Sequence, residues 1–406
     1  MKKISITLLS VILPILLISC DDGPPILPGL TKSQVVVSTN PEGATITVNG
    51  KAFEKTTPTY IDELEPGFYK IDVKKSTYLD TTFYIIFQRG RTDTINTMMR
   101  EDPAHWWKVW KTSNGLPSGP INDLVFDNSG SLWIASNGGG LAKFNNTTFQ
   151  IYTSTNSQIP SNFLRKIFFD KSNNIWVASS LGIAKFDGAV WTKFTDVNAN
   201  LVDNYITTIV EDKNNVIWFG TASGGLISFD GVRFNSYTMR NSGLPSNYIT
   251  SLVVDANNTK WIGTYGEGLV KFDNYNWQVF HVINSNLYNN YINDLFIDRQ
   301  GNLWIASGAS SAPVPVGTLT KFDGTNFRHY LGRGFTTVNK IGESPNGAIW
   351  IGTTTGLFSY FGEDWALYTL QNSGLPNNSV TSITFDAEGN KWIGGSSGLS
   401  KYIGGN

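Results

Sequence analysis

Apolar positions along most of the chain recur with a period in the low forties. A tryptophan marks each repeat, with spacings of 43, 42, 43, 43, 46 and 42 residues between Trp133, Trp176, Trp218, Trp261, Trp304, Trp350 and Trp392. Aliphatic residues stand nine and twelve positions before each tryptophan, and an aromatic-x-x-aromatic pair usually follows about sixteen positions after it. Short strands with turn residues at this period are typical of β-propeller blades. The pattern predicts seven units of four strands, a to d, within residues 104–406.

The seventh unit has no fourth strand of its own, because the sequence ends at Asn406 shortly after its third strand. A candidate strand lies instead at 105–110, before the first unit. An ungapped register places Trp106 at the aromatic position, whereas a one-residue deletion places Trp107 and Trp110 there and fits the aromatic pair better. In either register the N-terminal strand completes the last blade, closes the ring and removes an open sheet edge.

Residues 34–100 alternate in the manner of strands but lack the long period. Alternating segments at 45–48, 69–73 and 83–87 are separated by turn signals such as Asn49-Gly50. We expect a compact, mostly antiparallel β-domain here. The predicted fold is therefore all-β, a small antiparallel β-domain followed by a seven-bladed β-propeller closed by an N-terminal strand.

The first residues read as a targeting segment. A short basic head, residues 1–3, precedes an apolar run over 4–19 that is too short to span a membrane comfortably. We predict a signal peptide over 1–19. Residues 20–33 contain three prolines and read as a stiff tether without a core.

The sequence Leu17-Ile18-Ser19-Cys20 resembles the lipobox of bacterial lipoproteins. The resemblance implies that Cys20, the only cysteine, is lipidated and attaches the protein to a membrane. The alternative is an ordinary signal peptide or anchor with an incidental cysteine. Asp21 and Asp22 resemble a sorting signal toward the outer membrane or cell surface. We therefore expect an outer-membrane lipoprotein of the cell envelope, facing the periplasm or exposed at the surface.

Two further resemblances concern the rest of the chain. The segment 40–51, which begins Asn-Pro-Glu-Gly-Ala, resembles the PEGA domain, an extracytoplasmic β-module without known catalysis, which implies a spacer or adhesion role. The segments 241–247, 301–307 and 372–378 resemble the two-component regulator propeller repeat. That family forms the extracytoplasmic sensor of certain hybrid histidine kinases. This sequence shows neither a second hydrophobic span nor a kinase, so signalling is expected to pass through a partner such as a separate membrane sensor kinase.

Composition and charge exclude several classes of function. The chain has 31 basic and 32 acidic side chains and a net charge of −1, which argues against nucleic acid as a partner. One cysteine cannot form an internal disulfide, and three histidines argue against a zinc site or a Ser-His-Asp catalytic group. We therefore predict no metal and no cofactor.

Two repeated residues are interpreted as structural. The strand-b tryptophans are expected to form the core between blades rather than sugar-stacking platforms. An aspartate stands six positions before each tryptophan except in the sixth unit, where Ser344 replaces it. These aspartates lie beside turn residues, so we expect them to cap the turn between strands a and b rather than to bind metal or act as acids.

Function is sought where the repeat departs from its own rule. Strand a lines the channel of propellers, and its two polar positions carry mixed charges and hydroxyls, which suit a polar neutral ligand better than an anion. The predicted ligand-binding residues are Asn122, Asp123, Arg165, Lys166, Asn293, Asp294, Asn339 and Lys340, together with Tyr265, Glu267 and Arg333.

The fifth unit departs furthest. Its loop between strands b and c carries an insertion at 308–315, and the following loop between strands d and a is short and holds Gly332-Arg333-Gly334 in place of Gly-Leu-Pro. In propellers these two loops emerge on the same face, which suggests a binding site, although sequence drift explains them equally well.

The favoured function is non-catalytic recognition of a glycan or a protein partner by the propeller of a lipid-anchored extracytoplasmic protein, accessory to surface sensing. Two alternatives stay open. One is a propeller lyase or hydrolase that uses channel carboxylates, and the other is a structural module of a surface assembly.

Overall fold

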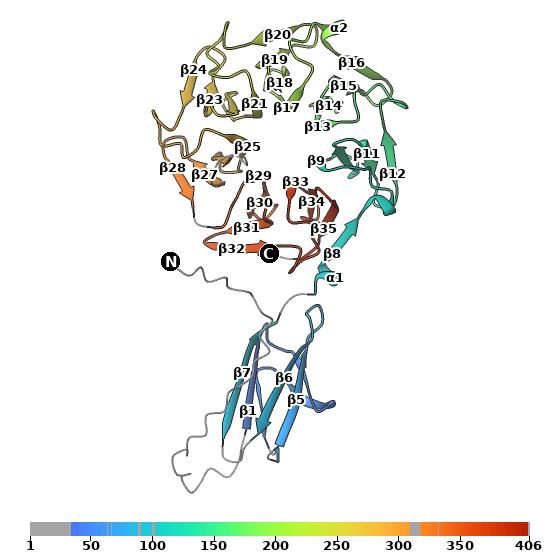
Figure 1. Cartoon of the computed structure of the whole chain (residues 1–406), viewed down its shortest axis with the longest axis vertical. Helices are drawn as coiled ribbons and strands as arrows, with labels where there is room; N and C mark the ends of the chain where they lie inside the picture. The colour runs from blue at the N-terminus through green and yellow to red at the C-terminus, as the bar shows by residue number, and fades with distance from the viewer. Residues whose placement is uncertain are drawn as a thin grey trace, which may run out of the picture. The chain divides into compact units, whose positions relative to one another are not determined.

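A computed structural model describes residues 34–62, 64–65, 67–87, 91–99, 102–308, 317–331 and 333–404. The predicted signal peptide, Cys20, the tether and residues 309–315 of the fifth-unit insertion lie outside the described residues. The chain divides into two units, residues 1–102 and 103–406 (Figure 1). Among the described residues, no helix is both long and apolar enough to cross a bilayer.

The N-terminal unit consists of two β-sheets around a small core. One sheet has the order β4 (Thr59–Asp62), β1 (Gln34–Asn40), β7 (Thr92–Met98), and the other has the order β3 (Lys51–Thr56), β2 (Thr45–Val48), β5 (Gly67–Lys74), β6 (Thr81–Phe87). All pairs are antiparallel except β1 with β7. Alternate residues of these strands, such as Val35, Val37, Ile71 and Val73, are buried. The structure confirms the mostly antiparallel β-domain.

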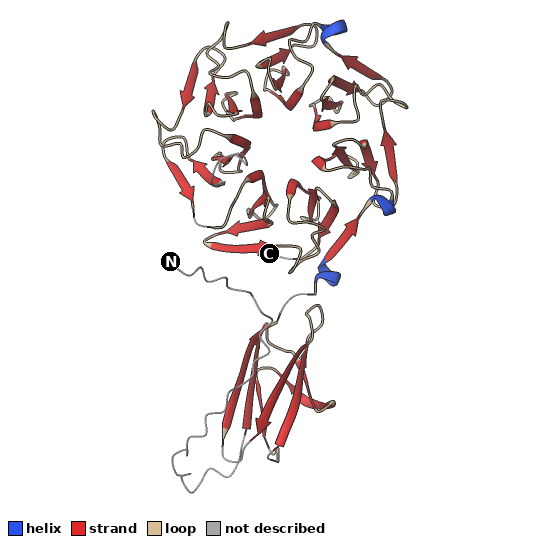
Figure 2. Cartoon of the chain, viewed as in Figure 1, coloured by secondary structure: helices blue, strands red, loops and turns tan. Residues whose placement is uncertain are grey.

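The second unit is a ring of seven four-stranded antiparallel sheets, with strand a of each sheet nearest the centre (Figure 2). Blade 1 comprises β9 (Ile121–Phe126), β10 (Leu132–Ser136), β11 (Gly140–Phe144) and β12 (Phe149–Tyr152). Blade 2 comprises β13 (Leu164–Phe169), β14 (Ile175–Ser179), β15 (Gly182–Phe186) and β16 (Trp191–Phe194). Blade 3 comprises β17 (Ile206–Glu211), β18 (Ile217–Thr221), β19 (Leu226–Phe229) and β20 (Phe234–Tyr237). Blade 4 comprises β21 (Ile249–Val254), β22 (Lys260–Thr264), β23 (Leu269–Phe272) and β24 (Trp277–Phe280).

The remaining blades repeat this order. Blade 5 comprises β25 (Ile292–Ile297), β26 (Leu303–Ser307), β27 (Thr318–Phe322) and β28 (Phe327–Tyr330). Blade 6 comprises β29 (Val338–Glu343), β30 (Ile349–Thr353), β31 (Leu357–Phe361) and β32 (Asp364–Tyr368). Blade 7 comprises β33 (Val380–Phe385), β34 (Lys391–Gly395), β35 (Gly398–Tyr402) and the N-terminal strand β8 (Trp107–Trp110). Short helical turns lie at α1 (Pro103–Trp106), η1 (Thr112–Asn114) and α2 (Asp196–Ala199). The predicted all-β fold is confirmed.

The ring closes through β8, as predicted. Trp107 pairs with Tyr402 and Trp110 with Leu399 in antiparallel register. The Trp107 ring stacks on Tyr402 with centroids 4.7 Å apart, and the Trp110 ring stacks on Trp392 at 5.2 Å. The structure therefore confirms the register that uses Trp107 and Trp110, whereas Trp106 ends helix α1.

Each strand-b tryptophan is core, as expected, with at most 7% of its surface exposed. In six blades its indole nitrogen donates to the aspartate six positions earlier, at 2.8–3.0 Å. The same carboxylate also caps the turn; for example, Asp127 Oδ1 accepts from the backbone of Ser129 and Ser131, both at 2.9 Å. The cap was predicted, and the bond to the indole was not. In blade 6 the Ser344 hydroxyl takes the place of the carboxylate, 3.3 Å from the Trp350 nitrogen.

A lysine covers one face of each strand-b tryptophan. In five blades it comes from strand c of the same blade, 4.9–5.6 Å from the ring centroid: Lys143, Lys185, Lys271, Lys321 and Lys401. In blades 3 and 6 strand c carries Ser228 and Ser359 at this position. There the lysine comes from the following blade, and Lys260 lies over Trp218 at 4.8 Å while Lys391 lies over Trp350 at 5.3 Å.

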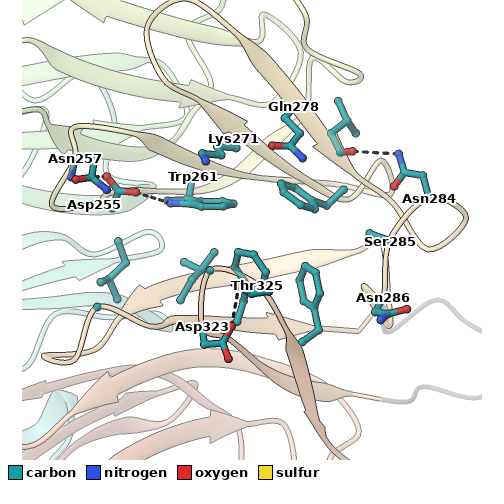
Figure 3. A pocket seen from close by; sticks show the side chains of 18 residues that line it. Asp255, Asn257, Trp261, Lys271, Gln278, Asn284, Ser285, Asn286, Asp323 and Thr325 are labelled. Atoms are coloured by element: carbon teal, nitrogen blue, oxygen red, sulfur yellow. Dashed lines mark hydrogen bonds between the residues drawn. The ribbon is translucent and has the colours of Figure 1, made fainter.

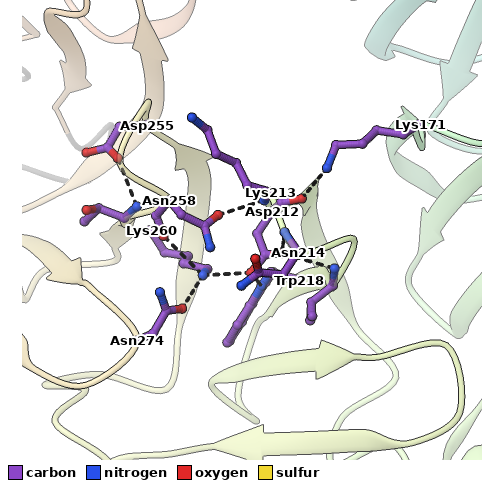
Figure 4. Close-up of polar contacts among 11 residues, drawn as sticks. Lys171, Asp212, Lys213, Asn214, Trp218, Asp255, Asn258, Lys260 and Asn274 are labelled. Atoms are coloured by element: carbon purple, nitrogen blue, oxygen red, sulfur yellow. Dashed lines mark hydrogen bonds and ion pairs between the residues drawn. The ribbon is translucent and has the colours of Figure 1, made fainter.

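Lys260 is fully buried, and its ammonium lies 2.8 Å from Asp212 Oδ2 and 3.3 Å from the Asn258 carbonyl oxygen (Figure 4). Burial alone would raise the pKa of Asp212, but hydrogen bonds from Lys260 and Trp218 lower it. At the interface that Lys391 covers, Ser344 occupies the position equivalent to Asp212, and Lys391 donates to the Gly404 carbonyl at 3.0 Å. Burial lowers the pKa of this lysine. The cores between blades are thus built from one repeated Asp-Trp-Lys cluster, with substitutions that compensate one another.

Candidate functional site at the channel mouth

A bulge at the start of strand a determines which side chains face the channel. In every blade the second residue of strand a is skipped in the pairing with strand b; in blade 2, for example, Leu164 pairs with Ser179 and Lys166 pairs with Ala178, and Arg165 has no partner. A bulge redirects a side chain that would otherwise alternate to the opposite face. This explains why each strand a carries two adjacent polar residues between aliphatic ones.

A cavity of about 430 Å³ lies where the strands a begin. We call it the channel mouth. The bulged residues of all seven blades line it, together with Tyr205, Tyr248, Tyr265, Gly308 and Thr337. The seven bulged residues are Asn122, Arg165, Thr207, Thr250, Asn293, Asn339 and Thr381.

Five of the seven bulged side chains form a belt that ties each blade to the next. Each donates to the backbone carbonyl of the first strand-a residue in the following blade. The bonds are Asn122 to Leu164 (2.6 Å), Thr207 to Ile249 (2.6 Å), Asn293 to Val338 (2.9 Å), Asn339 to Val380 (2.9 Å) and Thr381 to Ile121. The belt therefore has a structural role that the sequence pattern did not predict.

The belt is interrupted at blades 2 and 4. Arg165 Nη2 donates instead to the hydroxyl of Tyr205, and its guanidinium carbon lies 5.0 Å from the Tyr205 ring centroid. The Arg165 Nε is buried without a hydrogen-bond partner among the described residues, and so is the Thr250 hydroxyl. Buried polar atoms are nearly always paired, so two unpaired ones at one cavity require an explanation.

The third residue of strand a forms a second layer, one residue further along the channel. Asp123 accepts from Lys166 Nζ (3.1 Å) and from the backbone of Ile167 (3.0 Å). Asp294 accepts from Lys340 Nζ (3.0 Å) and from the backbone of Ile341 (2.9 Å). Burial alone would lower the pKa of Lys340, but the charges of Asp294 and Asp123 raise it.

These contacts bear on the chemistry of the predicted channel carboxylates. Asp123 and Asp294 are 3% and 7% exposed, and both oxygens of each accept a hydrogen bond. Each carboxylate is matched by one ammonium group, so this layer carries no net charge. The arrangement holds neighbouring blades together, because each carboxylate bonds to residues of the following blade.

Aromatic residues recur next to the channel mouth in consecutive blades, and three of them, Tyr205, Tyr248 and Tyr265, line it. Phe163, Tyr205, Tyr248 and Tyr291 each stand one residue before strand a in blades 2 to 5, and Tyr265 follows strand b of blade 4. We call these five residues the aromatic rim. Tyr265 stacks on Tyr248 with centroids 5.0 Å apart and meets Tyr291 edge-on at 5.1 Å. Tyr248, Tyr265 and Tyr291 are 37–46% exposed despite these contacts, and Phe163 is 54% exposed.

The structure brings most, but not all, of the predicted ligand-binding residues together. Asn122, Arg165, Asn293, Asn339 and Tyr265 line the channel mouth. The two Asp-Lys pairs form the next layer.

Glu267 and Arg333 do not line this cavity. Glu267 is exposed in the loop after strand b of blade 4. The Arg333 guanidinium lies 5.0 Å from the ring centroid of Trp365 on outer strand β32. The described ends of the two irregular loops of the fifth unit are in contact, because the Gly317 amide donates to the Phe335 carbonyl at 3.3 Å.

The predicted ligand-binding residues did not include Tyr205, Tyr248 or the threonines of the channel mouth, although the hydroxyls of strand a were expected to line the channel. A signal for the tyrosines was present. The residue thirteen positions before the tryptophan is aromatic in units 2 to 5, namely Phe163, Tyr205, Tyr248 and Tyr291, and is not aromatic in the other three. An aromatic residue limited to consecutive repeats points to one side of a ring.

A second cavity, of about 690 Å³, lies between blades 4 and 5 at the circumference and is lined by Trp261, Lys271, Gln278 and Asp323 among others (Figure 3). A cavity of about 650 Å³ occupies the equivalent place between blades 2 and 3. Because it recurs, this groove is a consequence of blade packing. Among the described residues, no cluster of three potential metal ligands occurs.

Comparisons with known families agree with this architecture. Residues 32–102 match the family profile of the PEGA domain. Residues 115–138, 200–223, 243–266 and 289–309 match the profile of the two component regulator propeller. No curated protein sequence matches the chain significantly.

Solved structures show the same fold. The extracellular domain of a putative hybrid two component system from B. thetaiotaomicron is 22% identical, with a TM-score of 0.64 over 89% of this chain and 55% of that one. A second such domain from the same organism is 20% identical, with a TM-score of 0.57 over 71% of this chain and 38% of that one. The virginiamycin B lyase of Staphylococcus aureus, solved with quinupristin, is 11% identical, with a TM-score of 0.60 over 73% of this chain and 98% of that one. This chain thus spans about half the length of the two-component structures or less.

Proposed function

We propose that this chain, which carries a PEGA domain and two-component regulator propeller repeats, is an extracytoplasmic binding protein of a sensing system. Its propeller recognises a glycan at the channel mouth without transforming it. The aromatic rim above a polar cavity is the observation that carries this proposal.

The shape and chemistry of the site favour a glycan over a protein as its occupant. Sites for small ligands usually have volumes of about 300–1,000 Å³, whereas a protein partner needs roughly 800 Å² of surface on each side. The channel mouth, at about 430 Å³, falls in the first class. A sugar ring presents an apolar face of C–H groups and an edge of hydroxyls. Exposed tyrosine rings suit the face, and the asparagine and threonine side chains beneath them suit the edge.

The location and the signalling route are part of the proposal. The similar two-component structures are extracellular domains. We propose that Cys20 carries the lipid anchor and that a separate membrane kinase transmits the signal. Metabolic labelling with an alkyne fatty acid tests the anchor: the wild-type protein should be labelled and Cys20→Ser should not. Labelling of Cys20→Ser, or none of the wild type, would contradict the anchor.

A glycan array with the purified protein tests recognition. We expect wild-type protein to bind a restricted set of glycans and Tyr248→Ala to lower the affinity at least tenfold, because the stacking surface is lost. Tyr275→Ala is the matched control, since Tyr275 belongs to the same blade, is 88% exposed and lies outside the channel mouth. Binding to no glycan, or equal loss in both variants, would refute the proposed site.

A further inference from the structure

We infer that the channel mouth selects sugars that carry an anionic group, a carboxylate or a sulfate ester, and that Arg165 is the residue that binds this group. The inference rests on the proposed function and names its ligand class. It concerns the interruption of the belt, not the belt itself.

The first argument is charge balance. Among the described residues that line the cavity, Arg165 alone carries a charge. Lys166 and Lys340 are each neutralised by a carboxylate at 3.0–3.1 Å, but no carboxylate of the described chain lies within ion-pair distance of Arg165. A charge in a partly enclosed cavity acts through a lower dielectric than water, so its attraction for an anion is stronger there. Positive and negative charges therefore cancel in the second layer, as the mixed charges of strand a suggested, but the channel mouth carries one uncompensated positive charge.

The second argument is unused hydrogen-bonding capacity. The guanidinium has five N–H donors in a planar fork that matches a carboxylate or sulfate. One of them is used for the Tyr205 hydroxyl, and Nε has no partner. The equivalent residues in five other blades donate their hydrogen bonds to the belt. Arg165 makes no such bond, so it has no part in that structural role.

The third argument is that the neighbouring groups fit the rest of such a ligand. Arg165 and Tyr248 line the same cavity, and the charge of Arg165 opposes the rise that burial causes in the pKa of the Tyr248 hydroxyl. Thr250, two residues after Tyr248, offers an unpaired buried hydroxyl. A sugar ring packed against the stacked pair Tyr248 and Tyr265 thus has a cation at one edge. Tyr205 acts as a positioning residue that holds the guanidinium.

The test is an array that carries uronate-bearing, sulfated and neutral glycans, followed by titration of the best ligand. We expect only acidic glycans to bind. Comparing the uronate-bearing with the sulfated glycans then shows which anion is preferred. Arg165→Gln should lower the affinity at least tenfold, and Arg165→Lys should retain part of it. Arg233→Gln, at an exposed arginine of blade 3 outside the channel mouth, should have no effect.

If Arg165→Gln fails to fold, the same question can be tested by changing the ligand instead of the protein. Reducing the carboxylate of the bound uronate to an alcohol, or removing the sulfate, should lower its affinity for wild-type protein to the same extent. Binding of neutral glycans that depends on Tyr248 but not on Arg165 would overturn this inference and leave the proposed function standing. Binding of no glycan at all would overturn both.

Discussion

The cores between blades and the channel mouth are built from the same repeat. They differ in whether an interaction that is lost at one blade is replaced by a neighbouring residue. In the core, loss of the strand-c lysine at Ser228 and Ser359 is compensated by Lys260 and Lys391 from the next blade. At the channel mouth, Arg165 and Thr250 leave the belt, and nothing described takes over their bonds. Where a lost repeat residue is replaced from the next blade, the interaction is still required for stability. Where it is not replaced, the position is available for another role.

The largest effect is expected in the core. Trp261→Ala removes a 7% exposed indole and should lower the free energy of unfolding by about 3–5 kcal/mol. Tyr248→Ala, at the mouth, should lower it by only about 0.5–1.5 kcal/mol, because this ring is 38% exposed and loses chiefly its stack on Tyr265. Thermal and urea unfolding of both variants provides the measurement. An unchanged melting temperature for Trp261→Ala would remove the distinction between the two regions.

The second effect concerns the two compensating lysines. Lys260→Met leaves the buried Asp212 carboxylate without its cation and should cost about 3 kcal/mol. Lys391→Met should cost less, about 1 kcal/mol, because Ser344 stands where a carboxylate would be stranded. Urea unfolding at neutral pH distinguishes the variants. Equal losses would mean that the ion pair with Asp212 contributes nothing beyond packing.

A third effect depends on pH. Burial alone would raise the pKa of Asp127, but hydrogen bonds from Ser129, Trp133 and Lys143 lower it from 3.8 to about 2. Because its pKa is lower in the folded state, this carboxylate contributes stability above pH 3.8 that is lost as the pH falls toward 2. The contribution is about 2 kcal/mol.

Thermal melts between pH 5 and pH 2.5 test this dependence. The gap between wild type and Asp127→Asn should narrow as the pH falls. Ser344→Ala, which changes the equivalent residue of blade 6 and removes no charge, should show a gap independent of pH. A constant gap for Asp127→Asn would contradict the role of its charge.

The smallest effect compares two threonines at the same place in neighbouring blades. Thr207 donates to the Ile249 carbonyl at 2.6 Å, so Thr207→Val should cost about 1 kcal/mol. Thr250 has an unpaired hydroxyl, so Thr250→Val should be neutral or slightly stabilising. Urea unfolding of the two variants gives the comparison. A loss at Thr250 equal to that at Thr207 would show that its hydroxyl is already used in the free protein.

Much of the fold followed from the sequence because it depends on local, repeated signals. The period of the tryptophans gave the number of blades, and the aromatic pair Trp107 and Trp110 gave the closing strand. The site was less accessible. Two adjacent polar residues in strand a indicated the channel, but only the bulge explains why both face inward. Hydrogen bonding between neighbouring blades then decides which of these side chains are already paired within the protein.

The position of Arg333 shows the same limit. Its loop departs from the repeat, yet the side chain lies over Trp365 rather than at the channel mouth. Spacing along the chain tells which loop is irregular, but the direction of a long side chain depends on neighbours from another part of the sequence.

Closure by β8 also sets the order of events during folding. Trp107 pairs with Tyr402, 295 residues later in the chain (402 − 107). Until the last blade is available, the tryptophans of β8 lack the strand that pairs with them, and blades 1 to 6 can form only as an open arc. The ring is therefore closed by the first and the last strands of its sequence, and any delay in the arrival of the last blade prolongs the time for which an unpaired sheet edge stays exposed.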